Sequence, residues 1–83
     1  MLYYCMDNRI NDFVEKMEEL YPKKWDFSSA QLMHICSETK TLPNNQADIY
    51  FFISLLVAQG ILIKVKQGKY EFDGDQYLGL RDK

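Results

Sequence analysis

The chain has 83 residues, of which 47% are hydrophobic and 27% charged, and its formal net charge is −2. This length predicts one small domain, residues 1–83, with a modest core. A charge so close to neutral gives no long-range attraction for a polyanion, which argues against strong nonspecific binding to nucleic acids. The N-terminal "MLYYCM" is apolar but too short for a signal peptide or a membrane span. We therefore expect a cytoplasmic protein with no membrane partner.

Side chains that carry catalysis or bind metals are few. Cys5 and Cys36 do not form a metal-type pattern, and both are expected to stay reduced. The single histidine, His34, has no partner at ligand spacing, and the glycines are too scattered for a phosphate-binding loop. We therefore expect no enzyme activity, no metal, no cofactor and no small-molecule substrate.

Two helices are predicted in the first half of the chain. Over residues 7–21 the apolar residues recur at helical spacing, which indicates a helix with one buried stripe. Pro22 follows its end. Ser28 and Gln31 have the spacing of a capping box, so a second helix is predicted to begin at Ser28 and to continue through Cys36.

A third helix is predicted after the turn-rich stretch "SETKTLPNN". Asn44 or Asn45 would cap its start, because a short polar side chain can accept a hydrogen bond from a free backbone N–H there. The helix is expected to run to about Gln59. Gly60 would end it, since glycine readily adopts the left-handed conformation found at helix ends.

Two alternating runs separated by Gln67-Gly68 predict a β-hairpin. The expected register places four apolar residues on one face of the hairpin. The expected pairs are Lys66 with Lys69, Val65 with Tyr70, Lys64 with Glu71, and Ile63 with Phe72. Residues 74–83 fit no predicted element.

The spacing of apolar residues and glycines in these predicted elements forms a pattern. Its residues are Leu32, Ile35, Ile49, Ile53, Leu56, Gly60-Ile61-Leu62 and Gly68-Lys69-Tyr70. With this spacing, the order of helix, short strand, helix, turn, helix and two-stranded wing resembles the winged helix-turn-helix superfamily over residues 7–73. The resemblance implies an α+β domain with a three-helix core and a C-terminal β-hairpin wing. In DNA-binding members the third helix enters the major groove and the wing touches the DNA. Other members bind proteins, so this fold alone does not decide the function.

The predicted third helix lacks the charges of a DNA reader. There is no lysine or arginine between Thr41 and Ile63. On a helical wheel, Ile49, Phe52, Ile53 and Leu56 form the inward stripe. The opposite face has no cation where a DNA reader needs basic groups for base edges and phosphates. A contiguous apolar face of this kind is typical of an interface. It consists of Ala47, Tyr50, Phe51, Ser54, Leu55 and Ala58.

Three hypotheses follow. The leading one is a non-catalytic regulatory protein that binds a protein partner, or a second copy of itself, through this apolar face. In the second, the N-terminal LYYCM or the C-terminal QYLGL segment covers the face within one chain. The third is a dimeric DNA-binding transcriptional regulator that uses the start of the third helix and nearby lysines, although lysines on a hairpin edge also serve to prevent aggregation. Its candidate DNA-binding residues are Asn45, Gln46, Lys40, Lys64, Lys66 and Lys69.

Overall fold

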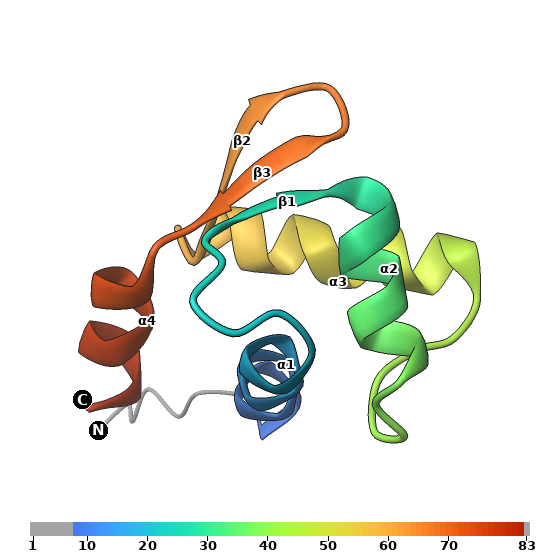
Figure 1. Ribbon diagram of the computed structural model, residues 1–83, viewed down its shortest axis with the longest axis horizontal. Helices are drawn as coiled ribbons and strands as arrows, with labels where there is room; N and C mark the ends of the chain where they lie inside the picture. Colours follow the sequence, from blue (N-terminus) through green and yellow to red (C-terminus); the bar gives the residue numbers. More distant parts are fainter. Residues whose placement is uncertain (1–7, 83) are drawn as a thin grey trace, which may run out of the picture.

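The computed structural model describes residues 8–82, which form four helices and a three-stranded antiparallel sheet (Figure 1). The α+β class and the order of the elements through the hairpin are confirmed. In chain order the elements are α1 (Asn8–Leu20), β1 (Asp26–Ser28), α2 (Ser29–Ser37), α3 (Gln46–Ala58), β2 (Leu62–Lys66), β3 (Lys69–Phe72) and α4 (Gly74–Arg81).

Local sequence signals set the ends of α2 and α3 as predicted. The backbone N–H of Gln31 donates to Ser28 Oγ at 3.2 Å, and the backbone N–H of Ser28 donates to Gln31 Oε1 at 2.9 Å, which completes the capping box. At the start of α3, Asn45 Oδ1 accepts from the backbone N–H of Asp48 at 2.9 Å. Gly60 has a φ of +78° and follows the end of α3, where a side chain would strain the backbone.

The core lies where α1, α2 and α3 meet beneath the sheet. The inward stripe predicted for α3 is confirmed, and within it Phe52 packs edge to face on Phe13 of α1, with ring centroids 5.8 Å apart. The sheet order is β1-β3-β2, so β1 joins the hairpin through the central strand β3. The buried residues of the core are Ile10, Phe13, Val14, Met17, Phe27, Leu32, Ile35, Cys36, Leu42, Ile49, Phe52, Ile53, Leu56, Ile61, Leu62, Tyr70 and Tyr77.

The predicted hairpin register is wrong beyond its first pair. Lys66 does face Lys69, but a β-bulge lies between Lys64 and Lys66, and it shifts the remaining pairs by one residue. The shift carries Leu62 into the core and leaves Ile63 and Val65 exposed. The bulge therefore exchanges the two faces of β2, because side chains alternate along a strand. The observed pairs are Lys64 with Tyr70, Ile63 with Glu71, and Leu62 with Phe72.

The segment that fitted no predicted element begins with α4. Asp73 caps this helix by accepting from the backbone N–H of Gln76 at 3.0 Å. Tyr77 is buried, and its hydroxyl donates to Asn11 Oδ1 of α1 at 2.7 Å. Gln76 Nε2 donates to the backbone oxygen of Gln59 at 2.9 Å. The tail thus docks on α1 and on the C-terminal end of α3.

The two neighbouring phenylalanines of α3 provide a direct test of its orientation. Phe52 is 2% exposed and Phe51 is 77% exposed. We predict that Phe52→Ala lowers the free energy of unfolding by about 3–5 kcal/mol, because it leaves a cavity in the core. The matched Phe51→Ala variant is expected to change it by less than about 0.5 kcal/mol. Urea unfolding followed by circular dichroism measures both, and equal losses would contradict the orientation of α3.

Candidate functional site

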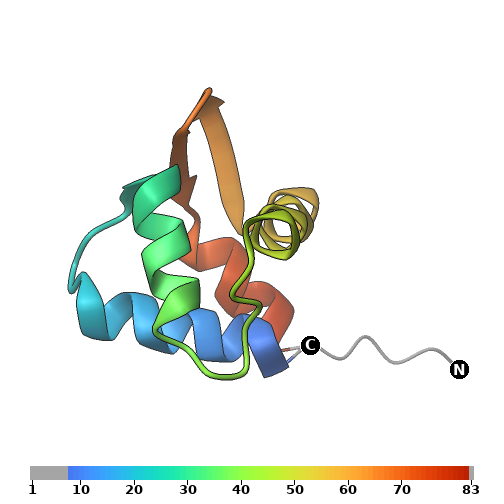
Figure 2. The same cartoon turned by 90° about the vertical axis from the view of Figure 1, so that its right-hand side faces the viewer.

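One side of α3 is exposed in the part of the chain that the structure describes. Phe51 is the most exposed of its large residues and Tyr50 is 41% exposed, while Leu55 is half-buried. Figure 2 looks nearly along α3 and shows the other described elements to one side of it, with none beyond its outer side. The structure thus brings six residues, called the outer face of α3 below, onto one surface: Ala47, Tyr50, Phe51, Ser54, Leu55 and Ala58.

The C-terminal segment does not cover this face. Its contacts with α3 lie at Gln59 and Gly60, at the end of the helix, and Phe51 stays open to solvent. The other segment considered for this role, LYYCM, lies outside the described residues. Intramolecular cover by QYLGL is therefore wrong, because α4 is held against α1 by its buried tyrosine.

Two hollows flank the outer face of α3. The hollow on the side of α1, of about 210 Å³, is lined by Arg9 and Pro43 together with Asp48, Phe51 and Leu55 of the helix. The one on the hairpin side measures about 530 Å³. The helix therefore forms a ridge, with open space along both flanks. From outside α3 the hairpin-side hollow is lined by Ser29, Lys64, Gln67, Gly68 and Tyr70.

Three polar side chains of α3 and its N-cap, those of Asn45, Asp48 and Ser54, make hydrogen bonds within the helix. Ser54 Oγ donates to the backbone oxygen of Tyr50 at 3.0 Å, so this serine presents a small and already bonded surface. Asn45 Nδ2 donates to the carboxylate of Asp48 at 2.6 Å while its Oδ1 caps the helix. The amide of Asn45 is therefore occupied, whereas Gln46 beside it is exposed. On the outer face, the hydroxyl of Ser54 thus already has a hydrogen-bond acceptor within the helix.

The structure does not gather the lysines of the DNA hypothesis on one surface. Lys64 lines the hollow between α3 and the hairpin. Lys66 and Lys69 face each other beside the hairpin turn and line a different hollow. Lys40 lies in the loop after α2, which is distant in sequence from the hairpin. It lines a hollow beside acidic residues of α1. The carboxylates that line the hollow with Lys40 are those of Asp12, Glu15, Glu19 and Glu38.

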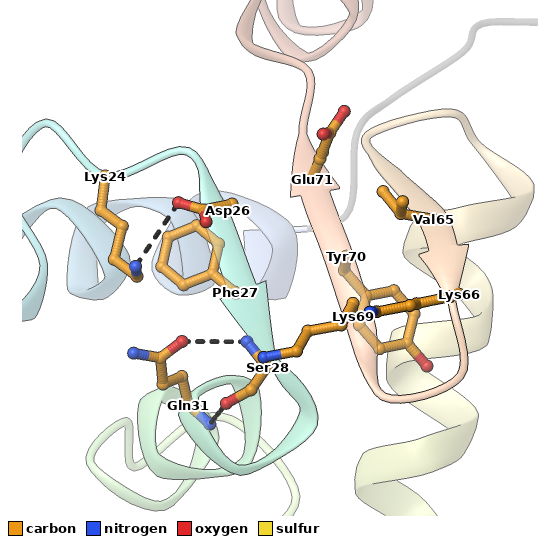
Figure 3. A pocket seen from close by; sticks show the side chains of 10 residues that line it. All are labelled: Lys24, Asp26, Phe27, Ser28, Gln31, Val65, Lys66, Lys69, Tyr70 and Glu71. Carbon is orange, nitrogen blue, oxygen red and sulfur yellow. Dashed lines mark hydrogen bonds and ion pairs between the residues drawn. The ribbon is translucent and has the colours of Figure 1, made fainter.

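The hollow that contains Lys66 and Lys69 is lined by residues of β1, α2 and the hairpin (Figure 3) and measures about 550 Å³. Figure 3 shows Lys24 and Asp26 on one side of it and the two hairpin lysines on the other. Lys24 is paired with Asp26 at 3.4 Å, and Glu71 adds a second carboxylate to the lining. Three lysines are therefore partly balanced by two acidic groups, which leaves a weak positive charge.

Sequence reasoning missed the residues that other elements contribute to the flanks of α3. Ser29 and Gln67 share the hairpin-side hollow with Tyr50, and Arg9 and Pro43 share the opposite hollow with Phe51. No local pattern could reveal them, since they are brought to α3 by the packing of α1, α2 and the hairpin. The signals in the sequence for this surface were the apolar residues opposite the inward stripe of α3 and the lack of lysine and arginine among them.

Residues 8–82 contain one histidine and one cysteine, both in α2. His34 lies near the end of α2, with its ring 6.3 Å from that of Tyr21. Cys36 is buried, and burial raises the pKa of its thiol to about 11. Within residues 8–82, histidine, cysteine, aspartate and glutamate side chains form no cluster of three or more suited to a metal ion. In the same part of the chain, no helix has the length and apolar character needed to cross a membrane.

Comparisons of the chain with protein-family models, with curated proteins and with solved structures give no match. The site is therefore interpreted from its own residues and geometry.

The raised pKa of Cys36 predicts a specific loss of stability at alkaline pH. Between its ordinary value of 9.0 and about 11, the thiol ionises in the unfolded chain but stays protonated in the folded one. The contribution of the neutral buried thiol to the free energy of unfolding is thus complete below pH 9 and is lost as the pH rises toward 11. Urea unfolding at pH values from about 8 to about 11 should show a steeper decline for the wild type than for Cys36→Ala. Parallel declines would contradict the burial of a neutral thiol.

Proposed function

We propose that the protein is a non-catalytic regulatory module of the winged-helix type, which acts through protein–protein contact at the outer face of α3. The observation that carries the proposal is the exposure of Phe51, 77%, at the centre of a face without any cation. Burying a large apolar side chain that is otherwise exposed contributes about 1.5–3 kcal/mol. A partner that covers this face gains that free energy and meets no charge on the six residues themselves, while Arg9 and Asp48 line the hollow beside them.

The winged-helix assignment is supported by the order and packing of the elements. Helices α1 to α3 share one core, and the hairpin β2–β3 projects from its edge, as the resemblance implies (Figure 1). In this arrangement α3 occupies the place of the recognition helix. The residues of its outer face differ from those of a DNA reader, since they are aromatic, aliphatic and small rather than basic. Contact with a protein accounts for this composition.

Replacing Phe51 by aspartate is expected to abolish the contact. The charge would have to be buried without a partner in any complex formed through this face. The matched control is Leu78→Asp, which places the same charge on another exposed helical position, 43% accessible, in α4. We expect Phe51→Asp to lose self-association in sedimentation velocity. It should also fail to capture a partner protein from an extract of the cells that make this protein, while Leu78→Asp keeps the wild-type behaviour. Circular dichroism checks the fold of each variant. Identical behaviour of all three proteins would contradict the proposal.

DNA binding is a second candidate function, which the hollow between α3 and the hairpin favours. Ser29, Tyr50, Lys64 and Gln67 line this hollow and offer hydroxyl, ammonium and amide donors. Such groups commonly contact the phosphates and sugars of DNA. A phosphate bound in this hollow would contact Lys64, since Lys66 and Lys69 do not line it.

The DNA hypothesis is tested by two charge reversals. Lys64→Glu is expected to weaken binding to random duplex at low salt and to reduce the slope of log K against log salt by about 0.9, the value for one lost phosphate contact. Lys40→Glu makes the same change of charge beside the carboxylates of α1 and should have little effect. Fluorescence anisotropy measures both variants. No detectable binding of the wild-type protein at low salt would remove this candidate.

A further inference from the structure

We infer that the partner at the outer face of α3 is a second copy of the same chain, paired antiparallel through α3 about a two-fold axis near the middle of the helix. This inference rests on the proposed function and names the partner for that face. The pair would be held by Phe51 of each copy, which packs on the small residues of the other.

The spacing of the exposed residues is that of a helix-pairing seam. Ala47, Phe51, Ser54 and Ala58 follow one another at intervals of four, three and four residues, all on the outer face. This is the a/d spacing with which two helices pack side chains into each other. The inward stripe of α3 already packs on α1 and α2. The helix thus carries a second stripe that no described element covers.

The seam is self-complementary only in the antiparallel sense. Phe51 and Ser54 lie at equal distances from the middle of the seam, and so do Ala47 and Ala58. An antiparallel pair therefore sets each Phe51 ring against Ser54 of the other copy. A parallel pair would set ring against ring and leave gaps at the alanines. Small residues opposite the ring permit close approach of the helices, at an interaxial distance of about 8 Å.

Charge also favours the antiparallel arrangement. Asp48 is the one charged side chain of α3, and it lies in the first turn. Antiparallel pairing puts the two Asp48 carboxylates at opposite ends of the helix pair, separated by roughly 13 Å along the axis at about 1.5 Å per residue. Parallel pairing would bring them to the same end. The helix macrodipoles likewise oppose one another in the antiparallel pair.

The area of the face predicts a reversible dimer. A buried aromatic side chain contributes about 150–250 Å². With Phe51 and Tyr50 exposed as they are, the six residues offer on the order of 400 Å². A stable specific interface buries about 800 Å² on each partner, so this helix pair lies at the weak end. We expect an equilibrium between monomer and dimer that shifts with protein concentration.

The edge of the sheet that β2 forms is a poorer surface for pairing than α3. Edge strand β2 exposes Ile63 and Val65, but a β-bulge interrupts its ladder. Lys64 and Lys66 flank the bulge, and a lysine-bearing, bulged edge resists the addition of another strand. Val65, 56% exposed, therefore provides a control residue for association through the edge.

Sedimentation equilibrium of the purified protein over a range of concentrations tests the identity of the partner. The apparent mass of the wild type is expected to rise from the 9.9 kDa of one chain toward twice that value. Phe51→Asp should remain at the mass of one chain, whereas Leu78→Asp and Val65→Asp should behave as the wild type. A wild type that stays monomeric at the highest concentration overturns the inference, and so does loss of association in Val65→Asp with retention in Phe51→Asp.

Disulfide cross-linking tests the orientation of the two helices. In a Cys5→Ser background, the Ala47→Cys and Ala58→Cys proteins are mixed and oxidised. Antiparallel pairing brings position 47 of one copy to the level of position 58 of the other, so disulfides between the two different variants should clearly exceed random pairing. Cys36 is expected to stay out of the reaction, because it is buried and its raised pKa makes its thiolate scarce. An excess of disulfides between two copies of the same variant overturns the antiparallel arrangement.

Failure of this inference can be told apart from failure of the proposed function. If the wild type is monomeric but captures a host protein in a manner that depends on Phe51, the partner is a different protein and the contact surface stands. If it dimerises through Phe51 only after residues 1–7 are removed, that segment is the occupant and a second copy is excluded as the native partner. If it is monomeric and Phe51→Asp changes nothing, both proposals fail.

Discussion

The edge-to-face contact between Phe13 and Phe52 determines which side of α3 faces solvent. Successive residues of a helix point about 100° apart, so packing Phe52 on α1 turns Phe51 away from the core. Ile49, Ile53 and Leu56 are buried on the same side of the helix as Phe52, so the whole inward stripe holds α3 in this orientation. The candidate site is therefore a consequence of the core, and the hollows beside it arise where α1 and the hairpin meet α3.

The two candidate functions use different parts of one helix and its surroundings. Protein contact uses the outer face centred on Phe51, whereas DNA contact would use the hairpin-side hollow with Lys64. A two-fold axis perpendicular to an antiparallel α3 pair keeps both hairpins on the same side of that pair. Self-association and nucleic-acid contact are thus geometrically compatible in one dimer. The separation of Lys64 from Lys66 and Lys69 limits the positive charge on either side of each hairpin.

Local signals in the sequence predicted most of the fold. The capping box at Ser28, the cap at Asn45 and the glycine after α3 involve neighbours in the chain, so residue identity and spacing are enough to locate them. The hairpin register and α4 were not predictable in this way. Leu62 and Ile63 are equally apolar, and the bulge that chooses between them depends on how β2 meets the core. Likewise α4 is held by Tyr77, through Asn11 of α1, 66 positions earlier.

The sequence by itself determined helices α1 to α3, the caps of α2 and α3, the inward stripe of α3 and the absence of cations opposite that stripe. These features follow from the spacing of apolar residues and from hydrogen bonds between residues close in sequence, so the order of the residues is enough to identify them. Only the tertiary structure decided that α4 leaves Phe51 uncovered, that the bulge exposes Val65, and that the hairpin lysines line separate hollows. Each of these outcomes depends on contacts between residues distant in sequence. In such contacts the burial of one side chain determines which of its neighbours remain exposed.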